Sequence, residues 1–213
     1  MKFLITPSLI NSWTWYLDSP EPNLDEFKAV LRRERMPDNE AMQNGRAFET
    51  RVRIACGNYE PNENELKDLE ATCPDGNELT DEYMNTVDEI ADIVRGGAWQ
   101  VSASKTIQVF GHDIVLYGRM DVLKGPWVFD IKFSHSYEIG KYLHSAQTKM
   151  YLALVPEVLG IRYLVSTGKV TAEDYYRRES VEPIENDVRD FLTWLKERKE
   201  LFDLYVQNWQ SKY

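Results

Sequence analysis

YGRMDVLKGPWVFDIKFS, residues 117–134, is the most informative stretch of the chain because it holds two strand-like runs on either side of a turn. In the second run, apolar residues at 129, 131 and 133 alternate with Asp130, Lys132 and Ser134. Alternate residues of a strand share a face, so these three polar side chains point the same way. The Lys-Gly-Pro sequence at 124–126 supplies the turn. The stretch predicts a hairpin that places Asp121 beside Asp130.

Two neighbouring carboxylates repel each other unless a cation lies between them. Asp121 and Asp130 offer hard oxygen ligands, which predicts one or two Mg²⁺ or Mn²⁺ ions. The backbone carbonyl of Ile131 is a further candidate ligand. Lys132, on the face of Asp130, could orient an attacking water and stabilise charge on a phosphate. The same residues also fit a half-buried strand whose wet face carries an Asp and a Lys, because Asp-x-Lys is a common sequence.

Outward from the hairpin, the patterning predicts a mixed α/β (α+β) fold. Strands are expected at 102–110, 113–123 and 127–134, which form a three-strand antiparallel meander, and at 161–166 and 170–177. Helices are expected at 6–17, 24–35, 39–56, 78–95, 138–155 and 183–208. A central mixed sheet flanked by helices follows. We interpret 1–213 as one domain, with a mainly helical part at 1–99, a catalytic sheet and helix at 100–180, and a C-terminal helix at 181–213.

Charge is distributed unevenly along the chain. The net charge is −10, but residues 100–178 carry ten Lys/Arg against seven Asp/Glu. Acidic residues gather in 57–93, where twelve of them accompany a single basic residue, Lys67. A basic region within an acidic protein is compatible with binding DNA. The acidic segment fits a solvated helical face, or a surface that keeps DNA from the wrong side.

Cysteine and histidine contents restrict the metal chemistry. Cys56 and Cys73 are too few for an iron–sulfur cluster, so we expect free thiols and no cluster. The three histidines lack zinc-site spacing. Without a membrane-length apolar run or a secretory signal, we expect no membrane partner and a cytoplasmic protein, in a bacterium or a phage-infected host.

Two further patterns carry weaker signals. Gln147 and Tyr151 lie four residues apart on a predicted helix and so share a face. Gly45 precedes Glu49 on another, and because glycine weakens a helix it hints at the close approach of another element. Each also has a plainer interpretation, an amphipathic tyrosine and an incidental glycine.

Five motifs occur in a family-like order: Thr6-Pro-Ser8-Leu-Ile, Gly45-Arg-Ala-Phe-Glu49, Gly118-Arg-Met-Asp121, Asp130-Ile-Lys132 and Gln147-Thr-Lys-Met-Tyr151. Their order and spacings resemble the RecB-type branch of the PD-(D/E)XK nucleases, over roughly residues 6–155. The resemblance implies a restriction-endonuclease-like core behind an N-terminal helical region, and a magnesium-dependent deoxyribonuclease.

The resemblance also assigns site residues. Glu49, Asp121 and Asp130 would bind metal, with Lys132 as the catalytic lysine. The resemblance gives Gln147 and Tyr151, together with Ser8 of the first motif, supporting or DNA-contacting roles. Apart from the resemblance, Arg119 and Lys149 are candidate phosphate contacts, because such contacts supply most sequence-independent affinity for DNA. Alternation along the strand places Arg119 on the face of Asp121.

Glu49 stands where many RecB-type members have histidine, which tilts the resemblance toward lambda-type exonucleases. The implied partner is DNA, duplex or single-stranded, with a free end, in recombination or repair of a phage type. A homo-oligomer and a recombination partner protein are compatible with it. Two alternatives stay open: a sequence- or structure-specific endonuclease, and a non-catalytic DNA-binding protein that keeps the nuclease fold.

Overall fold

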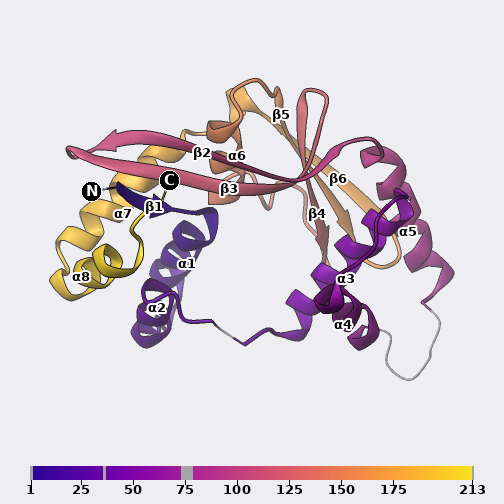
Figure 1. Cartoon of the computed structure of the whole chain (residues 1–213), viewed down its shortest axis with the longest axis horizontal. Coiled ribbons are helices and arrows are strands. Elements are labelled where there is room, and N and C mark those ends of the chain that lie inside the picture. Colours follow the sequence, from indigo (N-terminus) through magenta and orange to yellow (C-terminus); the bar gives the residue numbers. More distant parts are fainter. Residues whose placement is uncertain (1, 36, 73–78, 213) are drawn as a thin grey trace.

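A computed structural model describes residues 2–35, 37–72 and 79–212, which form a mixed α/β fold (Figure 1). Its strands are β1 Lys2–Ile5, β2 Ala98–Val109, β3 His112–Lys124, β4 Trp127–Phe133, β5 Gly160–Ser166 and β6 Thr171–Arg177. Its α-helices are α1 Pro7–Asp18, α2 Leu24–Leu31, α3 Glu40–Ala55, α4 Glu63–Ala71, α5 Asp81–Val94, α6 Ala146–Leu154, α7 Ile184–Lys196 and α8 Lys199–Asn208. The mixed α/β class, the helical N-terminal region and the antiparallel β2–β3–β4 meander are confirmed.

Strand β3 organises the sheet. β2 pairs antiparallel along almost the whole of one edge. The other edge is divided between β1, parallel to β3 up to Leu116, and β4, antiparallel to it from Val122 onward. Within the described ranges neither strand pairs with the intervening part of this edge, which we name the β3 gap. Main-chain polar groups there need partners other than a neighbouring strand.

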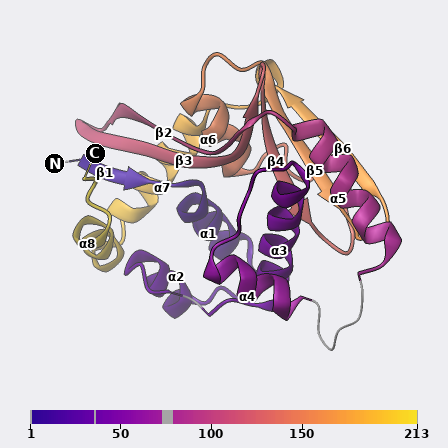
Figure 2. The ribbon, with the colours of Figure 1, turned by 45° about the vertical axis from the view of Figure 1, so that its right-hand side comes forward.

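Helices cover both faces beyond the gap. β4 runs parallel to β5, and β6 is antiparallel to β5 at the far edge. Phe129 and Ile131 of β4 pack with α3 and α5, whereas Val128 packs with α6 on the other face. This alternation is the period-two pattern expected of β4. Figures 1 and 2 show α3 and α5 on the opposite side of these strands from α6.

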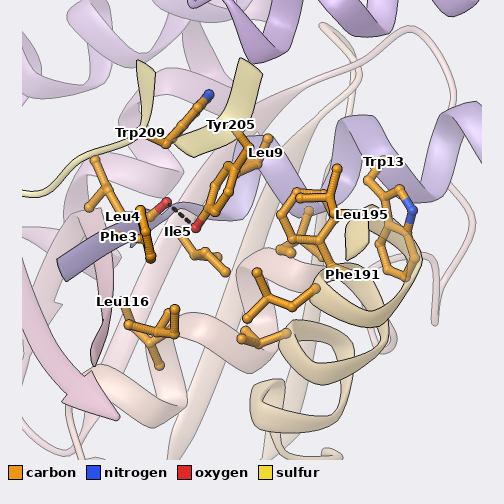
Figure 3. Packing of buried hydrophobic residues seen from close by; sticks show 14 of the residues in the cluster. Phe3, Leu4, Ile5, Leu9, Trp13, Leu116, Phe191, Leu195, Tyr205 and Trp209 are labelled. Atoms are coloured by element: carbon orange, nitrogen blue, oxygen red, sulfur yellow. Dashed lines mark hydrogen bonds between the residues drawn. The ribbon is translucent and has the colours of Figure 1, made fainter. Parts of the chain in front are cut away.

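The two ends of the chain share one core. β1 packs with α1, α7 and α8 against β3 in a cluster rich in aromatic side chains (Figure 3). The buried hydroxyl of Tyr205 donates to the carbonyl of Leu4 over 3.1 Å, and the indole of Trp209 donates to that of Leu31 over 3.0 Å. The C-terminal helices therefore hold β1 and α2 in place, each hydrogen bond contributing about 1 kcal/mol.

Several elements differ from the predictions. β1 and α4 were not predicted. α6 begins at Ala146, not near 138, because Ser145 caps it by accepting from the Thr148 amide at 3.2 Å. Residues 139–144 form turns instead, with Gly140 in a left-handed conformation (φ 91°). The predicted helix at 183–208 is two helices, since the chain turns at Glu197–Arg198.

Cys56 is a free thiol, half-buried, and burial raises its pKa, so it stays protonated near neutral pH. The prediction for Cys73 lies outside the described residues. No helix in the described part of the chain is both long and apolar enough to cross a membrane.

The turns ahead of α6 are fixed by a buried carboxylate. Asp174 of β6 accepts hydrogen bonds from the hydroxyls of Tyr137 and Tyr176, each at 2.5 Å, and from the Gly140 amide at 2.7 Å. Burial alone would raise the pKa of Asp174, but these donors outweigh it and hold that pKa below its usual value. The ionised carboxylate therefore stabilises the fold.

We expect Asp174→Asn to lower the free energy of unfolding by about 2 kcal/mol near neutral pH, since bonds to a charged acceptor are lost. A lowered folded-state pKa gives stability that is present above the unfolded value of about 3.9 and is lost as pH falls through the folded one. The difference between the two proteins should therefore shrink in acid. Urea unfolding of both across this range measures it; a constant difference would contradict the prediction.

Candidate active site

The candidate site begins where β4 leaves β3. Val122 of β3 pairs with Phe129 of β4. Beyond this pair, the carboxylate of Asp121 on β3 accepts a hydrogen bond from the amide of Ile131 on β4 at 2.9 Å. A side chain thus takes over where the main-chain ladder stops, and Asp121 lies beside Asp130 as the hairpin predicted. The N–H and C=O of a strand residue point to the same neighbour, so the Ile131 carbonyl also faces the β3 gap.

Asp130 is fully buried and makes two close polar contacts. Its Oδ1 lies 2.5 Å from Lys132 Nζ, and its Oδ2 accepts from the Gln147 amide. Oδ1 is buried with no hydrogen bond of good geometry. An isolated buried carboxylate is strongly disfavoured, so this group depends on cationic compensation.

Helix α6 closes the β3 gap from one side. Gln147 and Tyr151 share a face as predicted: Gln147 Nε2 donates to Tyr151 Oη over 3.0 Å, and Tyr151 Oη donates to the carbonyl of Arg119 over 2.6 Å. Burial raises the pKa of the Tyr151 phenol, which keeps it a donor at neutral pH. Tyr151 thereby satisfies a main-chain carbonyl that has no strand partner on that edge.

Glu49 approaches from α3. Phe48, its neighbour, is buried in the core under α3 and α5, and this anchors the helix. The Glu49 carboxylate accepts from the side-chain amide of Gln100 in β2. Burial and the nearby Asp130 raise the pKa of Glu49, while Lys132 and then Arg119 act in the opposite direction. Glu49 therefore lies within electrostatic reach of the Asp130–Lys132 pair.

Like charges dominate the site. Burial, Asp130 and Glu49 together raise the pKa of Asp121 well above its usual value. The pKa of Asp130 is also raised by burial, although Lys132 offsets part of this. Burial would lower the pKa of Lys132, but the two aspartates outweigh it and raise that pKa. Lys132 is therefore a cation at neutral pH, suited to stabilising negative charge and not to accepting a proton.

Two hollows open beside the site, and Arg119 lines both. One, of about 330 Å³, contains Glu49 and Gln100. The other, of about 370 Å³, contains Ser8 of α1 together with Gln147 and Tyr151 of α6. The structure thus brings Ser8 and Arg119 to the site, as predicted.

The acidic segment lies next to the first hollow. Arg46 of α3, which lines it, pairs with Asp68 of α4 at 2.7 Å and with Asp38 at 3.0 Å. Glu65 of α4 lines the same hollow and accepts from the Tyr59 hydroxyl at 2.6 Å. Part of the acidic segment therefore neutralises an arginine near the site, which neither sequence interpretation anticipated.

Three sequence expectations need correction. Lys149 is 8% exposed and pairs with Asp187 of α7 at 2.9 Å, so it lies away from the site. The reason is helix geometry: residues two positions apart, such as Gln147 and Lys149, point to nearly opposite sides of a helix. An added Cβ at Gly45 would meet nothing within 4 Å, so no element in the described part of the chain approaches closely there. The strand alternation that placed Arg119 with Asp121 is interrupted between them, because Met120 packs with α6 whereas Val122 packs with α3 and α5.

Gln100 was missed by sequence reasoning. The predicted strand began at 102, and no local pattern marks a contact with a residue 51 positions away. Recognising that β2 extends back to Ala98 would have placed it opposite Asp121.

Among the described residues, no three His, Cys, Asp or Glu side chains form a ready-made metal cluster. The donor chemistry nevertheless fits a hard cation. Glu49, Asp121 and Asp130 supply carboxylate oxygens, and the buried Asp130 Oδ1 has, among the described residues, the Lys132 ammonium beside it. Burial first, and then their mutual repulsion, raise the pKa of Asp121, and a divalent cation would relieve the repulsion.

Comparisons with known proteins find likeness among solved structures alone. No family model matches the chain, and no curated protein is significantly similar to it. Among solved structures, it is similar to the crystal structure of SSO0001, with 18% identity, coverage of 83% of this chain and 87% of that one, and a TM-score of 0.43.

We expect Asp121→Asn to stabilise the metal-free protein at neutral pH, on the order of 1 kcal/mol. Because the pKa of Asp121 is raised in the folded protein, its carboxyl group lowers the free energy of unfolding once the pH exceeds the pKa it has in the unfolded chain. Asparagine removes the charge and keeps an acceptor for the Ile131 amide. Urea unfolding in EDTA measures the change. Asp174→Asn is the matched control with the opposite sign, and a loss of stability in Asp121→Asn would contradict this account of the site.

We expect two glycine substitutions to diverge. In Gly118→Ala the added Cβ would lie 2.9 Å from the Tyr151 ring and 3.0 Å from Leu154, so overpacking should cost about 1–3 kcal/mol. In Gly45→Ala, on an open helix face, the change should gain about 0.5–1 kcal/mol through helix propensity. Thermal unfolding of both variants provides the comparison. Equal effects would mean that the Gly118–Tyr151 contact does not constrain the β3 gap.

Proposed function

We propose that this chain is a divalent-metal-dependent deoxyribonuclease that hydrolyses phosphodiester bonds from a DNA end. One observation carries the proposal: the half-buried Asp121 lies beside the fully buried Asp130, with the protonated Lys132 against Asp130. Such a group of like charges disfavours folding, so a functional reason for keeping it is expected. The motif resemblance supplies the reaction class.

Glu49, Asp121, Asp130 and the Ile131 carbonyl would hold one or two Mg²⁺ or Mn²⁺ ions. When bound, the metal supplies Lewis acidity toward a phosphoryl oxygen and lowers the pKa of a water ligand.

The chain's own residues would do the rest. Lys132, held as a cation, would stabilise the charge that develops on the phosphate. Gln147 contacts Asp130 and Tyr151 directly, so it fixes the carboxylate on one side and the β3 gap on the other. Arg119, exposed and shared by both hollows, is placed to contact a backbone phosphate.

DNA with a free end is the proposed partner, in recombination or repair inside the cell. The exonuclease form of the proposal comes from the lambda-type character of Glu49. Ser8 and Arg119 line the hollow beside Gln147, where a strand approaching the site would run. Lys149 is left out of this track because it is buried in an ion pair.

The test is digestion of linear and closed-circular duplex DNA with Mg²⁺, Mn²⁺ or EDTA. We expect metal-dependent loss of the linear form alone, reduced by about 100-fold or more in Lys132→Ala because its charge acts on the reacting phosphate. Lys169→Ala, which removes an exposed lysine from the turn between β5 and β6, is the matched control and should digest like wild type.

Other results change the assignment. Cutting of the circle would indicate an endonuclease. DNA binding without cleavage under any metal would indicate a non-catalytic binding protein. The absence of both DNA binding and DNA cleavage would overturn the proposal. Full activity in Lys132→Ala would also overturn it.

A further inference from the structure

Gln100 interrupts the β2–β3 ladder. On either side of it the register is regular: Trp99 pairs with Val122 and Val101 with Met120. Continuing that register places Gln100 opposite Asp121. At this point β2 adopts a left-handed backbone, with φ 53° at Gln100. A side chain with a Cβ disfavours this conformation, and within a strand it marks a local constraint.

The interruption changes which way the side chains point. Trp99 packs against the cluster under α3 and α5, whereas Val101, two residues on, packs with α6. On β3, Val122 and Met120 show the same switch. Residues two apart on a regular strand would share a face. The alternation of both strands therefore changes phase at Gln100 and Asp121, where the candidate site lies.

The Gln100 side chain has a definite partner. Its amide nitrogen donates to Oε1 of Glu49, and both residues line the hollow that Arg119 shares. Glycine or asparagine would suit a left-handed position better, but neither supplies a donor at this reach. An unfavourable backbone combined with a specific contact to a half-buried carboxylate is the pattern expected of a residue kept for function.

We infer that Gln100 is a positioning residue for the metal site: it orients the Glu49 carboxylate toward the Asp121–Asp130 pair. This inference rests on the proposed function. Partners that orient a metal ligand act through it, and their loss typically weakens metal binding or activity by about 10- to 100-fold. Gln100 donates to one oxygen of Glu49, which leaves the other oxygen for a cation.

The test is Gln100→Gly, with Mn²⁺ binding measured by calorimetry without DNA and unfolding measured in EDTA. We expect Mn²⁺ affinity to fall about tenfold or more. The unfolding midpoint should be unchanged or higher, because glycine accepts the left-handed backbone. In digestion assays kcat should fall while KM for DNA stays the same. A residue that only supported the fold would lower the midpoint and leave metal affinity alone.

Phe110→Gly is the matched control, since Phe110 follows the same strand with a similar φ of 51° but is 53% exposed at the hairpin turn. It should leave Mn²⁺ affinity at the wild-type value. Gln100→Asn is the second variant if the glycine protein does not fold. Asparagine tolerates this backbone and keeps the amide, but it is one methylene too short, so the same loss of affinity is expected.

The outcomes separate the two proposals. Wild-type Mn²⁺ affinity in both Gln100 variants, with normal binding and cleavage by the unsubstituted chain, would overturn the role of Gln100 and leave the nuclease proposal standing. A matching loss in Phe110→Gly would also overturn it, since the effect would then come from the strand pair as a whole. No Mn²⁺ binding and no cleavage by the unsubstituted chain would overturn both proposals.

Discussion

The site depends on the requirement that main-chain polar groups find partners both in the β3 gap and on β4 where it faces the gap. β1 and β4 share one edge of β3 and leave a stretch between them without a strand neighbour in the described structure. Two side chains meet this need: Tyr151 donates to the Arg119 carbonyl, and Asp121 accepts from the Ile131 amide. Both belong to the candidate site. These hydrogen bonds to the main chain help to hold the sheet together. They also fix the positions of the Asp121 carboxylate and of the α6 face that carries Tyr151.

This arrangement concentrates features that disfavour folding in one place. Burial and mutual repulsion raise the pKa of Asp121, and Gln100 adopts a left-handed backbone directly across from it. Elsewhere the fold is conventional, with a shared aromatic core at the chain ends and with three donors to the Asp174 carboxylate. Proteins commonly retain local instability at functional sites and compensate for it in the surrounding core. The contrast between Asp121 and Asp174, two aspartates whose pKa values shift in opposite directions, shows this within one sheet.

What the sequence could predict was local. Period-two alternation defined β4 and put Asp130 and Lys132 on one face, and helical spacing placed Gln147 with Tyr151. What it could not predict depends on contacts between distant segments. β1 is a four-residue strand that pairs with a segment about 110 residues later. Gln100 of β2 contacts Glu49 of α3, from which it is 51 residues away in the sequence. The prediction that Lys149 contacts DNA was wrong for the same reason, because only the position of α7 reveals its pairing with Asp187.

Charge balance bears on how many ions the site can take. Glu49, Asp121 and Asp130, when ionised, carry three negative charges, and Lys132 returns one. A single divalent cation would then bring these four side chains to neutrality, which removes the repulsion that raises the Asp121 pKa. A second cation would leave the group positive unless it arrived with another anion. On the proposed function, a phosphate of the DNA substrate would be that anion, so the DNA-free chain would have charge for one ion and a second would bind only together with the phosphodiester.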